Sequence, residues 1–126
     1  MYKVKSKPWP KVVRFYRALA ESPGNNWLAP MVGLVEQIEA ADFAQNLYGA
    51  TSLMQLRISY LPEFAPDKEV LNIDFDHKDE QFRFEYQETA SPLYKRWQRT
   101  CPPDQAFQTL VRFLKMKKWF SLSNRS

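Results

Sequence analysis

Residues 70–87 hold two consecutive stretches in which apolar and polar side chains alternate, and this pattern limits the possible folds more than any other feature. A period of two with one apolar face is typical of half-buried β-strands. The pattern predicts a β-hairpin with strands at about 70–76 and 81–87. Its apolar members are Leu71, Ile73, Phe75, Phe82, Phe84 and Tyr86.

The alternation also restricts the register of this hairpin. If Phe75 lies opposite Phe82, all the apolar side chains share one face, whereas a slip by one residue would turn one strand's set to solvent. The same register places Asp74 opposite Arg83 on the other face, as a favourable cross-strand pair. We expect a four-residue loop at 77–80, because the residues at 78 and 79 are unsuited to the positive φ of a two-residue loop.

Two further strands are expected. Apolar and polar residues alternate again at about 52–60, and the two apolar faces coincide if, for example, Tyr60 lies opposite Leu71. A fourth strand at 93–99 is a weaker expectation. Its charged residues Lys95, Arg96 and Arg99 suit the edge of a sheet, where charge discourages unwanted pairing.

Three segments show the three- and four-residue apolar spacing of amphipathic helices. We expect helices at about 11–22, 30–45 and 103–119. The second opens at Pro30, a favoured first-turn residue. Gly33 weakens that helix by up to about 1 kcal/mol relative to alanine, unless a close contact requires the missing side chain. The stripes contain Val12, Phe15, Tyr16 and Leu19; Met31, Leu34, Val35, Ile38 and Ala41; and Phe107, Leu110, Val111 and Leu114.

The order helix, helix, strands, helix predicts an α+β fold. We expect a two-layer domain in which an antiparallel sheet of three to four strands carries the helices on one face. The polar face would lie in solvent or under a partner. The 126 residues suit a single globular domain, 1–126, with an extended, basic, proline-containing segment at 1–10 and a short frayed tail at 121–126.

Charge is unevenly distributed along the chain. Residues 1–20 contain six Lys or Arg and no acids, residues 21–90 contain four basic and thirteen acidic residues, and residues 91–126 contain eight basic and one acidic residue. A basic surface for an anionic partner is one interpretation. Packing of the basic ends near the acidic middle is the other, and it is favoured because no charge run is long or interleaved with repeated aromatic residues.

Several broad classes find no support. No apolar run approaches the ~18 residues of a membrane span, and the first residues lack the apolar stretch of a secretory signal. Cys101 is the only cysteine, so no internal disulfide can form. A reducing, cytoplasmic location is therefore favoured, and no membrane partner is expected.

Four acidic residues and the only histidine lie close together in the sequence at the hairpin tip. Their spacing lacks the glycine and the closing glutamate of a calcium loop. We therefore predict no metal site and no cofactor. Cys101 precedes a helix start, yet a cysteine nucleophile normally needs a base, so a capping or packing role is favoured. No catalytic residue is predicted. The tip residues are Asp74, Asp76, His77, Asp79 and Glu80.

We predict a non-enzymatic domain that binds another protein, because the residue types include few suited to catalysis. Nucleic-acid binding through the basic terminal segments is a second hypothesis, and an enzyme or small-ligand binder that uses carboxylates is a third. Trp97 beside arginines could stack on a base or a peptide side chain. The candidate partner-binding residues are Lys95, Arg96, Trp97, Arg99 and Arg83.

Overall fold

The structure is a computed structural model that describes residues 4–64, 69–87 and 97–119. Its α-helices are α1 (Trp9–Glu21), α2 (Ala29–Ala40) and α3 (Ala106–Lys117), with 3₁₀ turns at Asn26–Leu28, Asp42–Asn46 and Pro103–Gln105. Its strands are β1 (Val4–Lys5), β2 (Tyr48–Ser52), β3 (Gln55–Ser59), β4 (Glu63–Phe64), β5 (Val70–Asp76), β6 (Gln81–Gln87) and β7 (Gln98–Cys101).

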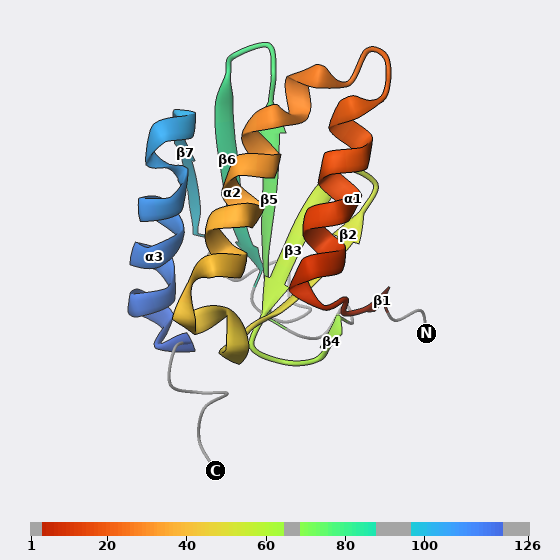
Figure 1. Cartoon of the computed structure of the whole chain (residues 1–126). Helices are drawn as coiled ribbons and strands as arrows, with labels where there is room; N and C mark the ends of the chain where they lie inside the picture. Colours follow the sequence, from red (N-terminus) through yellow and green to blue (C-terminus); the bar gives the residue numbers. More distant parts are fainter. Residues whose placement is uncertain (1–3, 65–68, 88–96, 120–126) are drawn as a thin grey trace.

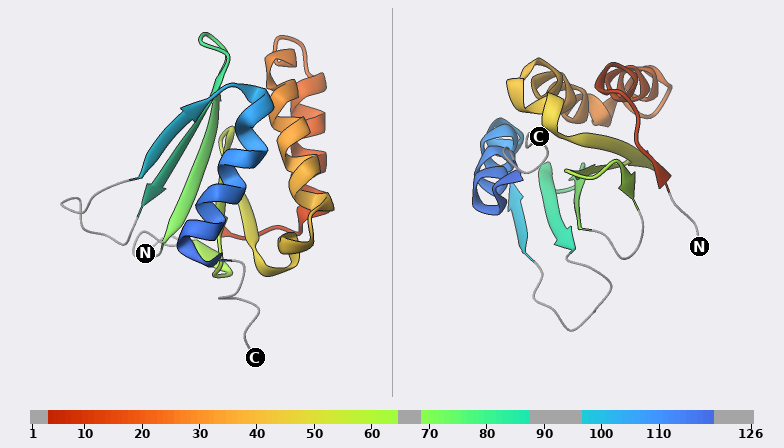
Figure 2. Two further views of the ribbon diagram at one scale, coloured as in Figure 1. Left: turned by 90° about the vertical axis from the view of Figure 1, so that its left-hand side faces the viewer. Right: turned by 90° about the horizontal axis from the view of Figure 1, so that it is seen from below.

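The described elements form two layers (Figure 1). One is an antiparallel sheet of five strands in the order β2-β3-β5-β6-β7, and the other consists of α1, α2 and α3. Both views of Figure 2 place the three helices on the same face of this sheet. The predicted α+β architecture is therefore confirmed, with one strand more than the three to four expected.

The central hairpin has the predicted register and loop. Phe75 lies opposite Phe82 and Asp74 opposite Arg83, and residues 77–80 form the four-residue connection. The inner side chains of β6 are buried against the helices, while Phe75 near the tip is half-buried. The ion pair of Arg83 is with Asp76, at 3.2 Å, rather than with the directly opposite Asp74.

The predicted strand at 52–60 is wrong in its bounds. The chain turns sharply at Leu53 and Met54, so β2 precedes the turn and only β3 follows it. The turn carries no glycine or asparagine, although Leu53 adopts the positive φ of 56° that usually selects such residues. Consequently Ile58, not Tyr60, lies opposite Leu71, two residues from the expected register and with the expected parity.

The helix bounds also differ from the predictions. α1 begins at Trp9, two residues early, because Pro10 is accommodated in the first turn. α2 ends at Ala40 rather than at about 45, and the extended Ala41 leads into a 3₁₀ turn. The indole nitrogen of Trp9 donates to the carbonyl oxygens of Ala44 and Leu47, each at 3.2 Å. These two carbonyls, which lie beyond the end of α2, are therefore satisfied by a tertiary contact.

The C-terminal elements follow the predictions more closely. The segment expected to be helical at 103–119 opens with a 3₁₀ turn, continues as α3, and ends at Lys118 in the left-handed conformation. β7 is an edge strand paired with β6, as the charge pattern indicated; it overlaps the expected strand at 98–99 and continues to Cys101. Residues 93–96 and the expected tail at 121–126 lie outside the described residues.

The outer face of the sheet is only partly open. The short strands β1 and β4 pair with each other, and Phe64 packs with Ala50 and Val70 in a second, smaller cluster. Because these residues are buried, the expectation that the whole outer face lies in solvent or under a partner is wrong for this part. Among the described residues, the loop at 77–80 and, on β7, Gln98 and Thr100 are exposed.

Two glycines provide a matched test of the packing. An added Cβ at Gly49 would lie 2.8 Å from Cη2 of Trp9, whose indole nitrogen is already bonded, whereas an added Cβ at Gly33 meets nothing within 4 Å. We expect Gly49→Ala to lower the free energy of unfolding by about 1–3 kcal/mol through overpacking. Gly33→Ala should raise it by about 0.5–1 kcal/mol through helix propensity.

Urea unfolding followed by tryptophan fluorescence measures both changes. An unaltered midpoint for Gly49→Ala would contradict the close packing of Trp9 on β2.

Candidate functional site

The two edges of the main sheet are protected differently. At the β2 edge, the backbone nitrogen of Lys7 donates to the carbonyl oxygen of Gly49 at 2.8 Å, and its Nζ donates to Thr51 Oγ1 at 2.9 Å. The segment before α1 therefore covers that edge. Such blocking is a common way to prevent one sheet from pairing with another.

The β7 edge has no such cover among the described residues. The backbone nitrogen of Tyr86 donates to the carbonyl oxygen of Trp97 at 2.9 Å, which fixes the pairs that exchange hydrogen bonds with β6. Because these pairs alternate along an antiparallel ladder, the N–H and C=O groups of Gln98 and Thr100 point away from β6. The backbone N–H and C=O groups of two alternate residues, Gln98 and Thr100, are thus presented at this edge.

A groove of about 440 Å³ runs beside this edge, between β7 and α3. Arg99 and Cys101 lie opposite Phe84 and Phe82, so their side chains lie on the helix side of the sheet. Figure 1 shows α3 lying along β7 at that side. The lining residues are Trp97, Arg99, Thr100, Cys101, Gln105, Thr109, Arg112, Phe113 and Met116.

The groove has an apolar end. The rings of Trp97 and Phe113 lie 4.9 Å apart between centroids, and Phe113 is buried. Met116, one turn further along α3, leaves 53% of its surface exposed and continues this apolar lining. This end offers an apolar side chain a partly prepared contact surface.

The middle of the groove is cationic. The guanidinium carbon of Arg99 lies 5.0 Å from the centroid of the Trp97 ring, and one guanidinium nitrogen donates to the carbonyl oxygen of Gln98 at 2.7 Å. Arg112 lines the groove from α3 and is exposed. No described carboxylate lines this groove, so the two positive charges are not neutralised within it.

The remaining end is small and polar. Cys101 is buried, and Thr109 Oγ1 lies 3.4 Å from its Sγ while also donating to the carbonyl oxygen of Gln105 at 2.9 Å. The single histidine, His77, contacts Trp27 instead, with ring centroids 4.6 Å apart. This arrangement supports the predicted packing role of Cys101.

The structure unites only some of the predicted partner-binding residues. Trp97 and Arg99 line the same groove, whereas Arg83 projects from the outer face opposite Thr100 and bonds to Asp76. Lys95 and Arg96 lie outside the described residues. The predicted set does not include Arg112, Phe113 and Met116, because no local signal relates α3 to an edge strand.

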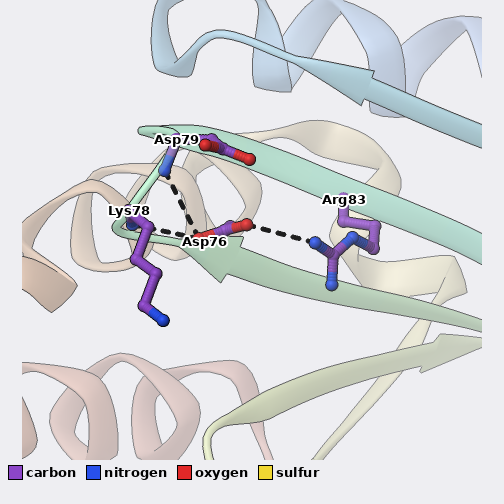
Figure 3. A network of polar contacts seen from close by, with 4 residues as sticks. All are labelled: Asp76, Lys78, Asp79 and Arg83. Atoms are coloured by element: carbon purple, nitrogen blue, oxygen red, sulfur yellow. Dashed lines mark hydrogen bonds and ion pairs between the residues drawn. The ribbon is translucent and has the colours of Figure 1, made fainter.

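The acidic cluster at the hairpin tip has a structural explanation (Figure 3). Asp76 Oδ1 accepts hydrogen bonds from the backbone nitrogens of Lys78, at 3.0 Å, and Asp79, at 3.4 Å, while Oδ2 pairs with Arg83. The pKa of the Asp76 carboxyl is lowered, chiefly because the backbone amide of Lys78 donates a hydrogen bond to it. Among the described residues, no group of three or more His, Cys, Asp or Glu side chains is placed to hold a metal ion.

A second polar cluster joins the far end of the sheet to α3. Glu69 accepts a hydrogen bond from Tyr86 Oη at 2.5 Å and pairs with Lys117 Nζ at 3.7 Å. Burial, followed by the hydrogen bond to Glu69, raises the pKa of Tyr60. These groups satisfy one another and tie α3 to the sheet, which makes the cluster a structural contact.

A second hollow, about 690 Å³ and open, lies beside the β2–β3 turn. It is mainly apolar, with Phe15, Leu19 and Met54 in its lining, and Leu53 at the turn is 93% exposed. This hollow also has charged lining residues, but its one arginine, Arg57, is accompanied by the carboxylate of Asp74, whereas no described carboxylate accompanies the two arginines beside β7. The β7–α3 groove is therefore the stronger candidate site.

Comparisons with family models, with curated proteins and with solved structures found no match to this chain. Within the described residues, no helix has the length and apolar character needed to cross a membrane.

The burial of Cys101 predicts slow thiol chemistry. We expect a thiol reagent such as Ellman's reagent to label the folded protein far more slowly than the urea-unfolded protein, because the folded protein leaves only 7% of Cys101 exposed. Stopped-flow absorbance measures the rates. Equal rates in the two states would contradict the described burial.

The Asp76 contacts predict a pH-dependent effect. A folded-state pKa below the unfolded value means that the carboxylate stabilises the hairpin above the unfolded pKa of about 3.9, and that this contribution is lost as the pH falls through the folded pKa. Asp76→Asn should therefore lower the urea midpoint at about pH 7 and have little effect at about pH 2. Asp79→Asn, in which the backbone donor at 79 is kept, is the matched control.

Proposed function

We propose that this chain is a non-enzymatic, cytoplasmic protein-binding domain that takes up an extended segment of another protein along the open edge of β7. The observation that carries the proposal is the outward direction of the backbone groups of Gln98 and Thr100 beside the β7–α3 groove. An added strand would hydrogen-bond to these groups, and its alternate side chains would enter the groove.

The contrast between the two edges supports this mode. The chain blocks β2 with Lys7 but leaves β7, among the described residues, without a pairing strand. Main-chain hydrogen bonds supply affinity in strand addition, and side-chain pockets supply specificity. Here the apolar surface of Trp97, Phe113 and Met116 provides such a pocket directly beside the available backbone groups.

The other hypotheses receive less support from the geometry. For nucleic acid, the half-buried Trp97 would have to stack on a base, but the Arg99 guanidinium already stacks on that ring, and the outer sheet face carries Asp74, Asp76 and Glu85. For catalysis, the groove offers two arginines and a buried thiol, without a carboxylate or histidine among its described lining residues to act as a base.

Thr100→Pro tests strand addition. Proline removes an N–H that points away from β6, so the internal ladder is kept while the edge loses a donor; proline is tolerated at such edge positions. We expect peptides selected from a random displayed library to bind this variant at least about tenfold more weakly than the wild-type protein. Thr100→Val, which keeps the N–H, should bind normally. Fluorescence polarisation measures the affinities.

Amide hydrogen exchange gives an independent readout. On peptide binding, the amides of Gln98 and Thr100 should become protected, while those of Arg99 and Cys101, which face β6, should change little. Binding that is indifferent to Thr100→Pro, or a library that yields no binder, would overturn the proposed function.

A further inference from the structure

Arg99 occupies the edge to which a partner strand would be added. One of its guanidinium nitrogens donates to the Gln98 carbonyl oxygen at 2.7 Å, and the guanidinium stacks over Trp97. That carbonyl is one of the acceptors that point away from β6. In the unbound protein Arg99 therefore satisfies an open acceptor and places a positive charge across the edge.

The free-energy cost of displacing the Arg99 guanidinium from the Gln98 carbonyl depends on the side chains of the incoming strand. A strand that donates its own N–H to Gln98 competes with the guanidinium for the carbonyl oxygen. If the strand is neutral, Arg99 loses a hydrogen bond and gains none. If a carboxylate of the strand faces the groove, Arg99 can exchange the carbonyl for a stronger, charge-assisted hydrogen bond.

Arg112 adds a second positive charge in the same part of the groove. It is exposed, and no described residue forms an ion pair with it. A carboxylate that enters between β7 and α3 would meet both guanidinium groups, which favours an anionic over a neutral side chain.

The neighbouring apolar surface sets the spacing of the ligand. Trp97 and Arg99 are two residues apart on one face of the chain, about 7 Å along a strand. An added strand has the same repeat, so two of its side chains separated by one residue would meet the apolar end and the cationic middle respectively.

On the basis of the function proposed above, we propose that Arg99 blocks the β7 edge in the unbound protein, a role we call the guard, and that it selects a partner by charge. The ligand is an extended protein segment in which a carboxylate and an apolar side chain lie two residues apart on the same face. The edge becomes available when the Arg99 guanidinium leaves the Gln98 carbonyl oxygen and binds that carboxylate.

Two peptide pools test the ligand class. Blocked nonapeptides carry a central Leu-x-Glu or Glu-x-Leu in the acidic pool and Leu-x-Gln or Gln-x-Leu in the neutral pool, with Thr and Val randomised elsewhere; both orders are needed because the strand direction is open. Wild-type protein should enrich the acidic pool, and an enriched peptide should bind about tenfold more tightly than its Glu→Gln counterpart.

Two variants separate the guard from simple charge attraction. In Arg99→Ala, the acidic peptide should bind more weakly and its neutral counterpart more tightly than in the wild-type protein, because the acceptor is no longer covered. In Arg112→Ala, only the acidic peptide should lose affinity. Lys115 is an exposed α3 residue that does not line the groove, so Lys115→Ala should change the affinity for neither peptide by more than about twofold. Unchanged thermal unfolding checks the folding of each variant.

The possible failures are distinguishable. Equal binding of both pools, with both weakened by Thr100→Pro, would leave strand addition intact and overturn the charge selection. An equal loss in Arg99→Ala and Lys115→Ala would indicate diffuse attraction and overturn the guard. A lack of response to Thr100→Pro in any bound peptide would overturn the proposed function itself, as would tighter binding of a single-stranded oligonucleotide than of either pool at the same site.

Discussion

The register of the β5–β6 hairpin is the constraint on which the rest of the structure depends. With Phe75 opposite Phe82, the apolar side chains of both strands face the helices, and every other strand of the sheet must match that parity to bury its own. β3 does so by placing Ile58 opposite Leu71. The same parity reaches β7, where Arg99 lies opposite Phe84 and is therefore directed to the helix side.

The candidate site follows from the end of this pattern. On β5 and β6 the inner positions are filled by apolar side chains, whereas on β7 the exposed Arg99 lies beside the small, buried Cys101, and Trp97 immediately precedes the strand. The core thins at this edge, and α3 closes it only partly, through Trp97 and Phe113. A groove results in which an apolar surface, positive charge and open backbone groups lie together. Strand addition uses open backbone groups together with side-chain pockets, and at the β2 edge Lys7, from the segment before α1, is already paired with Gly49.

The errors in the sequence-based predictions have particular physical causes. The turn at Leu53 was missed because its residues are apolar and one adopts a positive φ without glycine, so the alternation appeared to continue through it. α2 ends early, at the extended Ala41, and the carbonyls of Ala44 and Leu47 beyond it accept hydrogen bonds from the Trp9 indole, a tertiary contact that no local pattern indicates. For the acids at the hairpin tip no metal site is predicted, and the structure adds that Asp76 accepts hydrogen bonds from the loop and pairs with Arg83.

The sequence by itself determined the fold class, the hairpin with its register and loop, and the approximate helices, because these depend on side-chain periodicity over a few neighbouring residues. It also indicated that a charged edge strand follows the hairpin, and it named Trp97 and Arg99. Only the tertiary structure decided that Arg112, Phe113 and Met116 face them, that Arg83 lies on the opposite face, and that the β2 edge is covered while the β7 edge has no pairing strand among the described residues. Those relations join residues distant in the chain, and only the packing of α3 and the segment around Lys7 against the sheet brings them together.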